Sequence, residues 1–214
     1  MRVIVPYDER NPKTRLSGVL EPDERRGFAR AMLRDVLAAA RSADADPLIV
    51  SPSPMALGDC EVCVDDRPLS RAVNERLRAS PEPVAVVMAD LPLLRAETLR
   101  SLFSRTKDVV LARGLGGGTN ALVSRTDEFA VDYHGRSYLD HRAIAEDVGA
   151  TVAEADSYRL AVDVDEPDDL AEVLLHGDGR ASEWLRENEF RLDAGSGRCD
   201  VRRAKRGVAG EPHR

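Results

Sequence analysis

The sequence predicts an α/β fold, a three-layer sandwich around a mostly parallel central sheet. Short β-branched runs alternate along the chain with segments of helical periodicity, which is the order of elements typical of βαβ units. Residues 84–88 form an unbroken apolar run, the pattern of a strand covered on both faces. The length of 214 residues suits one such domain better than two small ones.

Local patterns predict each element in turn. A helix is expected from about Glu21 to Arg41, because proline and acidic residues favour the first turn and apolar residues then recur at intervals of four. Further helices are expected at residues 69–77, 95–103, 138–147, 168–175 and 181–187. Strands are expected at residues 3–6, 47–50, 61–64, 84–88, 109–112, 120–123, 151–153 and 158–164.

Charge is distributed unevenly along the chain. The net charge is −7, but residues 198–214 carry +4 and residues 1–197 therefore carry −11. An acidic body does not attract nucleic acid or anionic membranes, so neither is expected as a partner. Glycine, arginine and small residues mix near the C-terminus. We expect a single domain over residues 1–194 and a basic, disordered tail over residues 195–214.

Cysteine content and the N-terminal segment indicate a cytoplasmic protein. Three cysteines in a chain of this length argue against a disulfide framework. Cys60 and Cys63 have the spacing of half a zinc site, but no second pair follows, and zinc is not expected. The chain lacks the apolar run of a signal peptide, and no stretch approaches the roughly 18 apolar residues of a membrane span.

Open α/β sheets bind ligands beyond the carboxyl ends of their strands, which directs attention to the loop after the first strand. Residues 6–17 form this loop and lead toward a helix N-terminus, which attracts anions. Lys13 and Arg15 are well placed there to meet phosphate oxygens. A solvated surface loop with ordinary charges is the alternative interpretation.

Carboxylates follow two other predicted strands. Asp90 comes directly after the buried run and is placed to hold Mg²⁺ at the phosphates of a nucleotide, or to cap a helix. On a strand, Asp163 and Asp165 would share one face, where their repulsion calls for a cation. A solvated acidic turn is the alternative. Asp168 and Asp169 fall in the first turn of the next helix and are interpreted as structural.

A glycine run at residues 116–118 precedes Thr119 and Asn120. Glycine lets a backbone approach a ligand closely, and the two polar side chains add hydrogen-bonding groups, although a flexible turn is the alternative. Ser137 opens a later helix and could cap it or hold an acidic substrate. His141 in the same helix has no evident partner and is expected at the surface.

Four segments together resemble the CofC family, the 2-phospho-L-lactate guanylyltransferases of deazaflavin coenzyme (F420) biosynthesis, within the MobA-like nucleotidyltransferases. The segments are residues 11–17 (NPKTRLS), 89–93 (ADLPL), 117–122 (GGTNAL) and 163–170 (DVDEPDDL). The resemblance extends over about residues 1–175. It departs from the family pattern at Asp8, where many members carry lysine.

The resemblance implies a Rossmann-like fold of GT-A type and transfer of GMP from GTP to a small phosphorylated acid, with Mg²⁺ as cofactor. It implies catalytic roles for Lys13, Arg15 and Asp90. Nucleotide binding is expected at Pro6, Lys13, Arg15, Ser51, Pro52 and Asp90. Substrate binding is expected at Thr119, Asn120, Gly135 and Ser137, and metal binding at Asp90, Asp163 and Asp165.

Several alternatives stay open at this point. The acceptor could be 2-phospho-L-lactate, phosphoenolpyruvate or 3-phosphoglycerate. A transferase for molybdopterin or a sugar phosphate is the nearest rival, but the loop at residues 6–13 lacks its glycine-rich pattern. The Asp-x-Asp at residues 163–165 also occurs in glycosyltransferases. A catalytically silent binder of nucleotide or nucleic acid, using the basic tail, is the alternative from another class. A homodimer is compatible with the sequence.

Overall fold

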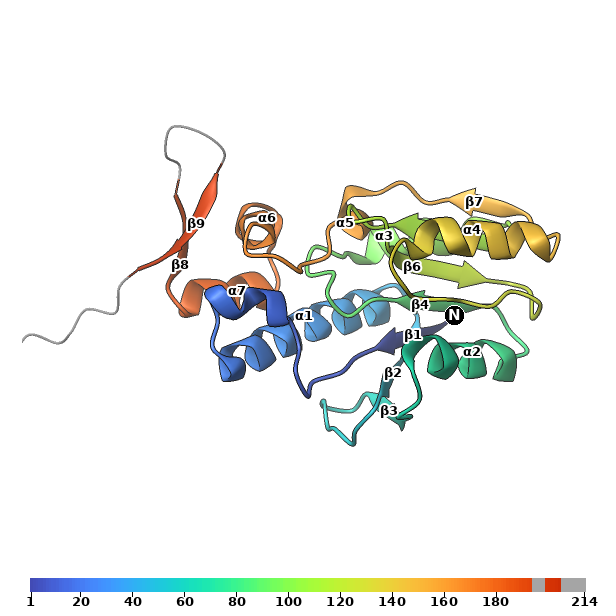
Figure 1. Cartoon of the computed structure of the whole chain (residues 1–214), viewed down its shortest axis with the longest axis horizontal. Coiled ribbons are helices and arrows are strands. Elements are labelled where there is room, and N and C mark those ends of the chain that lie inside the picture. Colours follow the sequence, from blue (N-terminus) through green and yellow to red (C-terminus); the bar gives the residue numbers. More distant parts are fainter. Residues whose placement is uncertain (194–198, 205–214) are drawn as a thin grey trace, which may run out of the picture.

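The computed structural model describes residues 1–193 and 199–204, and a seven-stranded sheet forms its centre (Figure 1). The strand order is β3–β2–β1–β4–β6–β5–β7. The strands are β1 (Arg2–Pro6), β2 (Asp46–Ser51), β3 (Glu61–Val64), β4 (Val84–Val87), β5 (Val109–Arg113), β6 (Thr119–Ser124) and β7 (Val152–Glu154). Strand β6 runs antiparallel to both of its neighbours, and the other pairs are parallel. The mostly parallel sheet is confirmed.

Helices cover both faces of this sheet, which confirms the three layers. They are α1 (Pro22–Ser42), α2 (Leu69–Ala79), α3 (Ala96–Phe103), α4 (Ser137–Asp147), α5 (Tyr158–Ala161), α6 (Asp169–His176) and α7 (Arg180–Glu187), with a 3₁₀ turn at Thr14–Gly18. One apolar core joins the sheet to α1, α3, α5, α6 and α7. A second core joins the opposite face to α2 and α4.

Helix α1 begins where the sequence predicts. Glu21 is its N-cap and forms a reciprocal capping box with Glu24, whose carboxylate accepts the Glu21 backbone N–H at 3.0 Å. Phe28 and Met32 are fully buried against the sheet. Phe28 also contacts Trp184 at 5.4 Å between ring centroids, which holds α7 on α1. The loop after β1 is thus anchored between a central strand and a well-capped helix.

The predicted strand at residues 158–164 is wrong. Tyr158–Ala161 form α5, and the residues that follow enter no sheet in the described part of the chain. Val164 donates its backbone N–H to the carbonyl of Asp90 at 3.2 Å. The apolar alternation arises because Val162 and Val164 are buried on an irregular segment. This segment lies against the loop after β4, so Asp163 and Asp165 come near Asp90.

Beyond α7, strands β8 (Phe190–Asp193) and β9 (Asp200–Arg203) form a hairpin at one end of the long axis of the molecule (Figure 1). Arg203 pairs with Glu24 of α1 at 2.6 Å and lies over the Phe190 ring at 5.0 Å. A strand at residues 200–203 therefore replaces the disorder expected there. Residues 194–198 and 205–214 of the expected tail lie outside the described residues. Within the described ranges, no helix combines the length and the apolar character needed to cross a membrane.

Candidate active site

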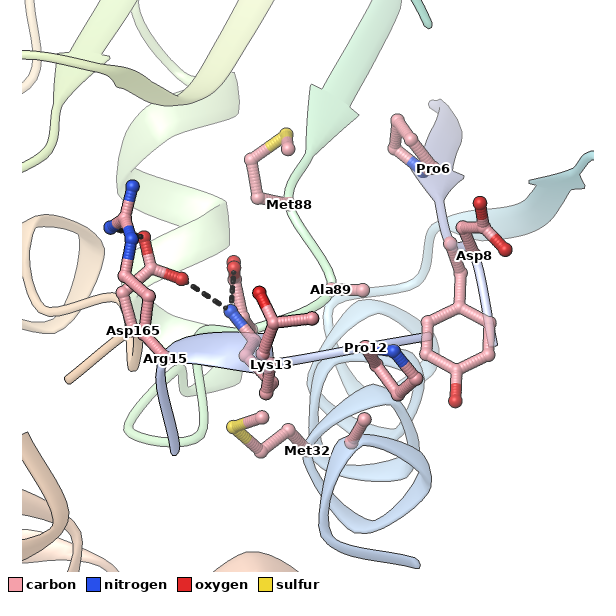
Figure 2. Close-up of a pocket in the computed structure, with 13 residues that line it drawn as sticks. Pro6, Asp8, Pro12, Lys13, Arg15, Met32, Met88, Ala89 and Asp165 are labelled. Atoms are coloured by element: carbon pink, nitrogen blue, oxygen red, sulfur yellow. Dashed lines mark hydrogen bonds and ion pairs between the residues drawn. The ribbon is translucent and has the colours of Figure 1, made fainter. Parts of the chain in front are cut away.

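Two adjoining cavities lie beyond the carboxyl ends of β1, β2 and β4. The first has a volume of about 310 Å³ and is lined by the loop after β1, by α1 and by the loop after β4 (Figure 2). The second has a volume of about 420 Å³ and reaches toward β2 and the start of α2. Both are lined by Pro6, Tyr7, Asp8 and Met88, so they form one cleft.

Lys13 is the electrostatic centre of the first cavity. Its Nζ donates to Asp90 Oδ2 at 2.6 Å and to Asp165 Oδ1 at 2.8 Å, and both hydrogen bonds are drawn as dashed lines in Figure 2. Its backbone is left-handed, with φ 52° and ψ 48°, which costs a non-glycine residue roughly 1–2 kcal/mol. Burial alone would lower the pKa of the Lys13 ammonium, but the charges of Asp90 and Asp165 raise it overall. Lys13 is therefore charged at neutral pH.

Asp165 is held between cations and a structured turn. Arg15 Nη1 lies 3.4 Å from Asp165 Oδ2. Burial acts to raise the pKa of the Asp165 carboxyl, but Lys13 outweighs it and the pKa is lowered. Asp169 Oδ2 accepts the backbone N–H groups of Asp165 and Glu166 at 2.8 and 2.7 Å. The structural interpretation of Asp169 is confirmed, because this carboxylate shapes the turn that presents Asp165.

Asp163 is hydrogen-bonded to an amide, whereas Asp165 is paired with cations. Asn120 Nδ2 donates to Asp163 Oδ1 at 3.0 Å and to the Leu160 carbonyl at 3.0 Å. Burial raises the pKa of the Asp163 carboxyl, and the charge of Asp90 raises it further, against the opposing effect of the Asn120 hydrogen bond. The negative charge of Asp90 therefore acts on the Asp163 carboxyl, and the hydrogen bond from Asn120 joins Asp163 to the start of β6.

The donor atoms suit a divalent cation that arrives with a nucleotide. Among residues 1–193 and 199–204, no three His, Cys, Asp or Glu side chains are grouped closely enough to hold a metal by themselves. Lys13 lies between Asp90 and Asp165, two of the three expected ligands. Asp90 Oδ1, however, is buried and accepts no hydrogen bond within the described chain. Mg²⁺ commonly takes one or two carboxylates plus substrate phosphates, so Asp90 has the right chemistry to anchor it.

A β-bulge exchanges the faces of the sheet toward which Thr119 and Asn120 point. Ala112 pairs with Ala121 and Arg113 pairs with Thr119, so that Asn120 is the extra residue. Regular alternation would place Thr119 on the face of Ala121, which packs in the core next to α1. Because of the bulge, Thr119 instead contacts α4, and Asn120 reaches the Leu160 carbonyl on the other face.

Thr119 contacts two residues of α4, Ser137 through its backbone and His141 through its side chain. The Thr119 backbone N–H donates to Ser137 Oγ at 3.0 Å, and Thr119 Oγ1 lies 2.9 Å from Nδ1 of His141. His141 Nε2 accepts the backbone N–H of Asp132 at 2.8 Å. His141 is 0% exposed, so its expected surface position is wrong. His141 follows Tyr138 by three positions and precedes Ala145 by four, and this helical spacing of apolar residues could have indicated that His141 is buried.

The other expected site residues divide between the cleft and its surroundings. Pro6, Lys13, Arg15 and Asp90 line the first cavity, and Pro52 lines the second. Ser51 is 1% exposed, and its hydroxyl donates to the Ser53 carbonyl at 2.9 Å, so it shapes a turn. Gly135 lies in an exposed loop with φ +49°. The cleft residues that were not among the expected site residues include Tyr7, Asp8, Met32, Asp65, Asp66, Arg67 and Met88. Apart from Asp8, no local pattern distinguishes them.

Gly114 makes room for the Asn120 side chain. A Cβ at Gly114 would lie 2.6 Å from Asn120 Oδ1, whereas one at Gly116 would meet no atom within 4 Å. Gly114→Ala is therefore expected to displace Asn120 from Asp163 and to lower the free energy of unfolding by roughly 1–3 kcal/mol, measured by urea unfolding. The matched control Gly116→Ala is expected to stay within about 0.5 kcal/mol of the unchanged protein. Equal stability of the two variants would contradict this role of Gly114.

An open, mostly parallel sheet with helices on both faces and a cleft at its carboxyl edge, where a lysine bridges two carboxylates, is the arrangement of an α/β protein of the nucleotidyltransferase fold. Two solved structures share it. One, described as a nucleotide-diphospho-sugar transferase from Desulfovibrio desulfuricans G20, is 17% identical with a TM-score of 0.68, over 87% of this chain and 94% of that one. The other, a nucleotidyl transferase from Methanothermobacter thermautotrophicus, is 17% identical with a TM-score of 0.58, over 87% and 98%.

The chain belongs to the family of guanylyl transferases described as CofC like, whose model matches residues 1–206. The match extends beyond residues 1–175 and includes part of the segment expected to be an unrelated tail. A 2-phospho-L-lactate guanylyltransferase of Halomicrobium mukohataei is 57% identical over 95% of this chain and 100% of its own length. Its counterpart in Haloferax volcanii is 56% identical, over 96% and 100%.

Proposed function

We propose that this protein transfers GMP from GTP to 2-phospho-L-lactate and releases pyrophosphate, a step toward the deazaflavin coenzyme F420. The observation that carries the proposal is the Lys13 bridge between Asp90 and Asp165 in a cleft at the carboxyl edge of the sheet. Family membership supports GMP as the transferred group. The names of the similar proteins support 2-phospho-L-lactate as the acceptor.

The two cavities suit the two ends of GTP. The first presents Lys13 and Arg15 and would take the triphosphate, because both side chains carry positive charge. The second combines apolar surface from Val50 and Pro52 with the acidic side chain of Asp66 and would take the base. Guanine offers two neighbouring N–H donors on its pairing edge, and a carboxylate is a matching acceptor.

The chemistry then needs charge compensation more than a general base. A phosphate monoester loses its second proton near pH ~6, so the acceptor phosphate is already a nucleophile at neutral pH. The described residues that line the cleft include no histidine or cysteine, which agrees with this requirement. An oxygen of the acceptor phosphate attacks the α-phosphorus of GTP, a new P–O bond forms, and the bond to the pyrophosphate leaving group breaks.

The residues of the first cavity would stabilise this exchange. Lys13 and Arg15 would neutralise the charge that develops on the departing pyrophosphate. A divalent cation, proposed to be Mg²⁺ at Asp90 with Asp163 or Asp165, would supply charge neutralisation and alignment of the phosphates. Thr119, Asn120, Gly135 and Ser137 are proposed to surround the acid substrate.

The deciding experiment measures pyrophosphate release from GTP with Mg²⁺ and one acid at a time. The acids are 2-phospho-L-lactate, phosphoenolpyruvate and 3-phosphoglycerate, and ATP and CTP replace GTP as controls. We expect release that depends on GTP and is fastest with 2-phospho-L-lactate. Faster release with another acid would identify that acid as the substrate in place of 2-phospho-L-lactate. No release from folded protein with any acid would overturn the proposal.

The competing idea of a nucleic-acid binder that uses its basic C-terminal segment has a separate test. Deletion of residues 205–214 removes Lys205, Arg206 and Arg214 and leaves the β8–β9 hairpin in the chain. A transferase is expected to keep its turnover after this deletion. The binder would be favoured if the full chain bound nucleic acid, the deletion abolished this binding, and neither protein showed turnover.

A further inference from the structure

We infer that His141 is a positioning residue that orients the hydroxyl group of Thr119, so that this hydroxyl donates a hydrogen bond to an anionic oxygen of the acid substrate beside Ser137. The inference rests on the proposed function. It deepens that function by naming the group that sets the polarity of the acid subsite. His141 itself touches no reacting atom.

The hydrogen bonds of His141 determine which of its nitrogens carries the proton. The backbone N–H of Asp132 can only donate, and it lies 2.8 Å from Nε2, so Nε2 carries a lone pair. A neutral imidazole then has its proton on Nδ1, which lies 2.9 Å from Thr119 Oγ1. The ring is neutral at physiological pH, because burial lowers the pKa of His141 to about 4. His141 therefore donates and the Thr119 oxygen accepts.

In this arrangement the hydroxyl protons of Thr119 and Ser137 are still available for donation. Thr119 Oγ1 accepts from His141, and Ser137 Oγ accepts from the Thr119 backbone N–H. No acceptor for either hydroxyl proton is found within residues 1–193 and 199–204. The two residues are only 3% and 4% exposed, so bulk solvent has little access to these hydroxyl groups, and each hydroxyl can still donate one hydrogen bond. Two donors without acceptors are suited to bind a carboxylate or phosphate oxygen.

The position of the pair in the fold connects it to the proposed reaction site. Thr119 is followed by Asn120, which donates to Asp163, and the Asn120 carbonyl accepts the N–H of Met88 at 2.9 Å. Met88 lines both cavities of the cleft. Ser137 is the first residue of α4, whose N-terminal dipole also favours an anion.

Aromatic packing fixes the orientation of the imidazole. The rings of Phe129 and Tyr133 meet His141 edge-on, at 6.0 and 5.0 Å between centroids. The ring therefore has little freedom to rotate away from Thr119. A rigid donor at Nδ1 occupies a lone pair of the Thr119 oxygen, so the Thr119 hydroxyl proton is left for another acceptor.

Steady-state kinetics with matched variants test the inference. His141→Phe keeps an aromatic ring but removes the donor, and it is expected to raise the KM for 2-phospho-L-lactate at least tenfold while the KM for GTP changes less than twofold. His141→Asn carries an amide nitrogen on Cγ, as Nδ1 is, and is expected to restore the KM to within about threefold. Thr119→Val should match His141→Phe, and the double variant should show no further loss, because both remove one interaction.

A packing control separates positioning from simple support of the fold. Leu77→Ala removes apolar contacts from α2 in the core that α2 shares with α4, so it is expected to lower the melting temperature and leave both KM values within twofold. An unchanged acid KM in His141→Phe, or equal increases in the acid and GTP KM values, would overturn the inference while wild-type turnover upholds the proposed function. Absence of turnover in the folded wild-type protein with every acid would overturn both.

Discussion

Asp90→Asn is expected to reduce turnover by about 10³-fold or more while the protein stays folded. Asp90 combines the ion pair to Lys13 with a second, buried oxygen that has no partner within the described chain. An uncharged amide is a much poorer ligand for a divalent cation, and loss of its charge stabilisation corresponds to roughly 4 kcal/mol in the barrier. The measurement is kcat from pyrophosphate release at saturating and at limiting Mg²⁺, beside a thermal unfolding curve.

Asp168→Asn is the matched control for this substitution. Asp168 is exposed and precedes α6 without a side-chain capping bond. Its replacement is expected to leave turnover within about twofold, as is usual for a surface carboxylate with no specific partner. If the Asp90→Asn variant turned over at a nearly normal rate at limiting Mg²⁺, Asp90 would not be a metal ligand.

Lys13→Met is expected to lower kcat/KM for GTP by roughly 10²–10³-fold and to change the KM for the acid less. Methionine keeps much of the length and apolar stem of the side chain but loses the ammonium between Asp90 and Asp165. The incoming triphosphate would then meet two uncompensated carboxylates, and removal of one preorganised hydrogen-bond donor typically costs about 2.7–4 kcal/mol of transition-state stabilisation. Initial rates over a range of GTP concentrations check this expectation.

Lys107→Met provides the comparison, because Lys107 is exposed and lines neither cavity of the cleft. It is expected to leave the kinetics of GTP unchanged. Lys13→Arg keeps the charge with a different geometry and is expected to fall between the other two variants. GTP kinetics of Lys13→Met equal to those of Lys107→Met would exclude Lys13 from the nucleotide site.

Most of the fold could be predicted because the signals for its elements are local. The capping residues and apolar spacing of α1 lie within one short segment, and the apolar run at β4 reports burial on both faces directly. The prediction of a strand at residues 158–164 was wrong because an alternating pattern shows only which side chains are buried, not whether the backbone pairs with a neighbouring strand. Backbone pairing is a separate property, and here one hydrogen bond from Val164 to Asp90 replaces a strand ladder.

The sequence by itself determined the layers, the strand ends and the identities of the charged residues near them, since each depends on neighbours a few positions apart. Only the tertiary structure decided how those residues meet. Lys13 bridges carboxylates 77 and 152 positions away, and the bulge beside Asn120 reverses the faces that regular alternation would assign. His141 acquires its role from a backbone amide and a hydroxyl on other elements. Such contacts depend on how separate elements pack, and no local pattern in the chain records that geometry.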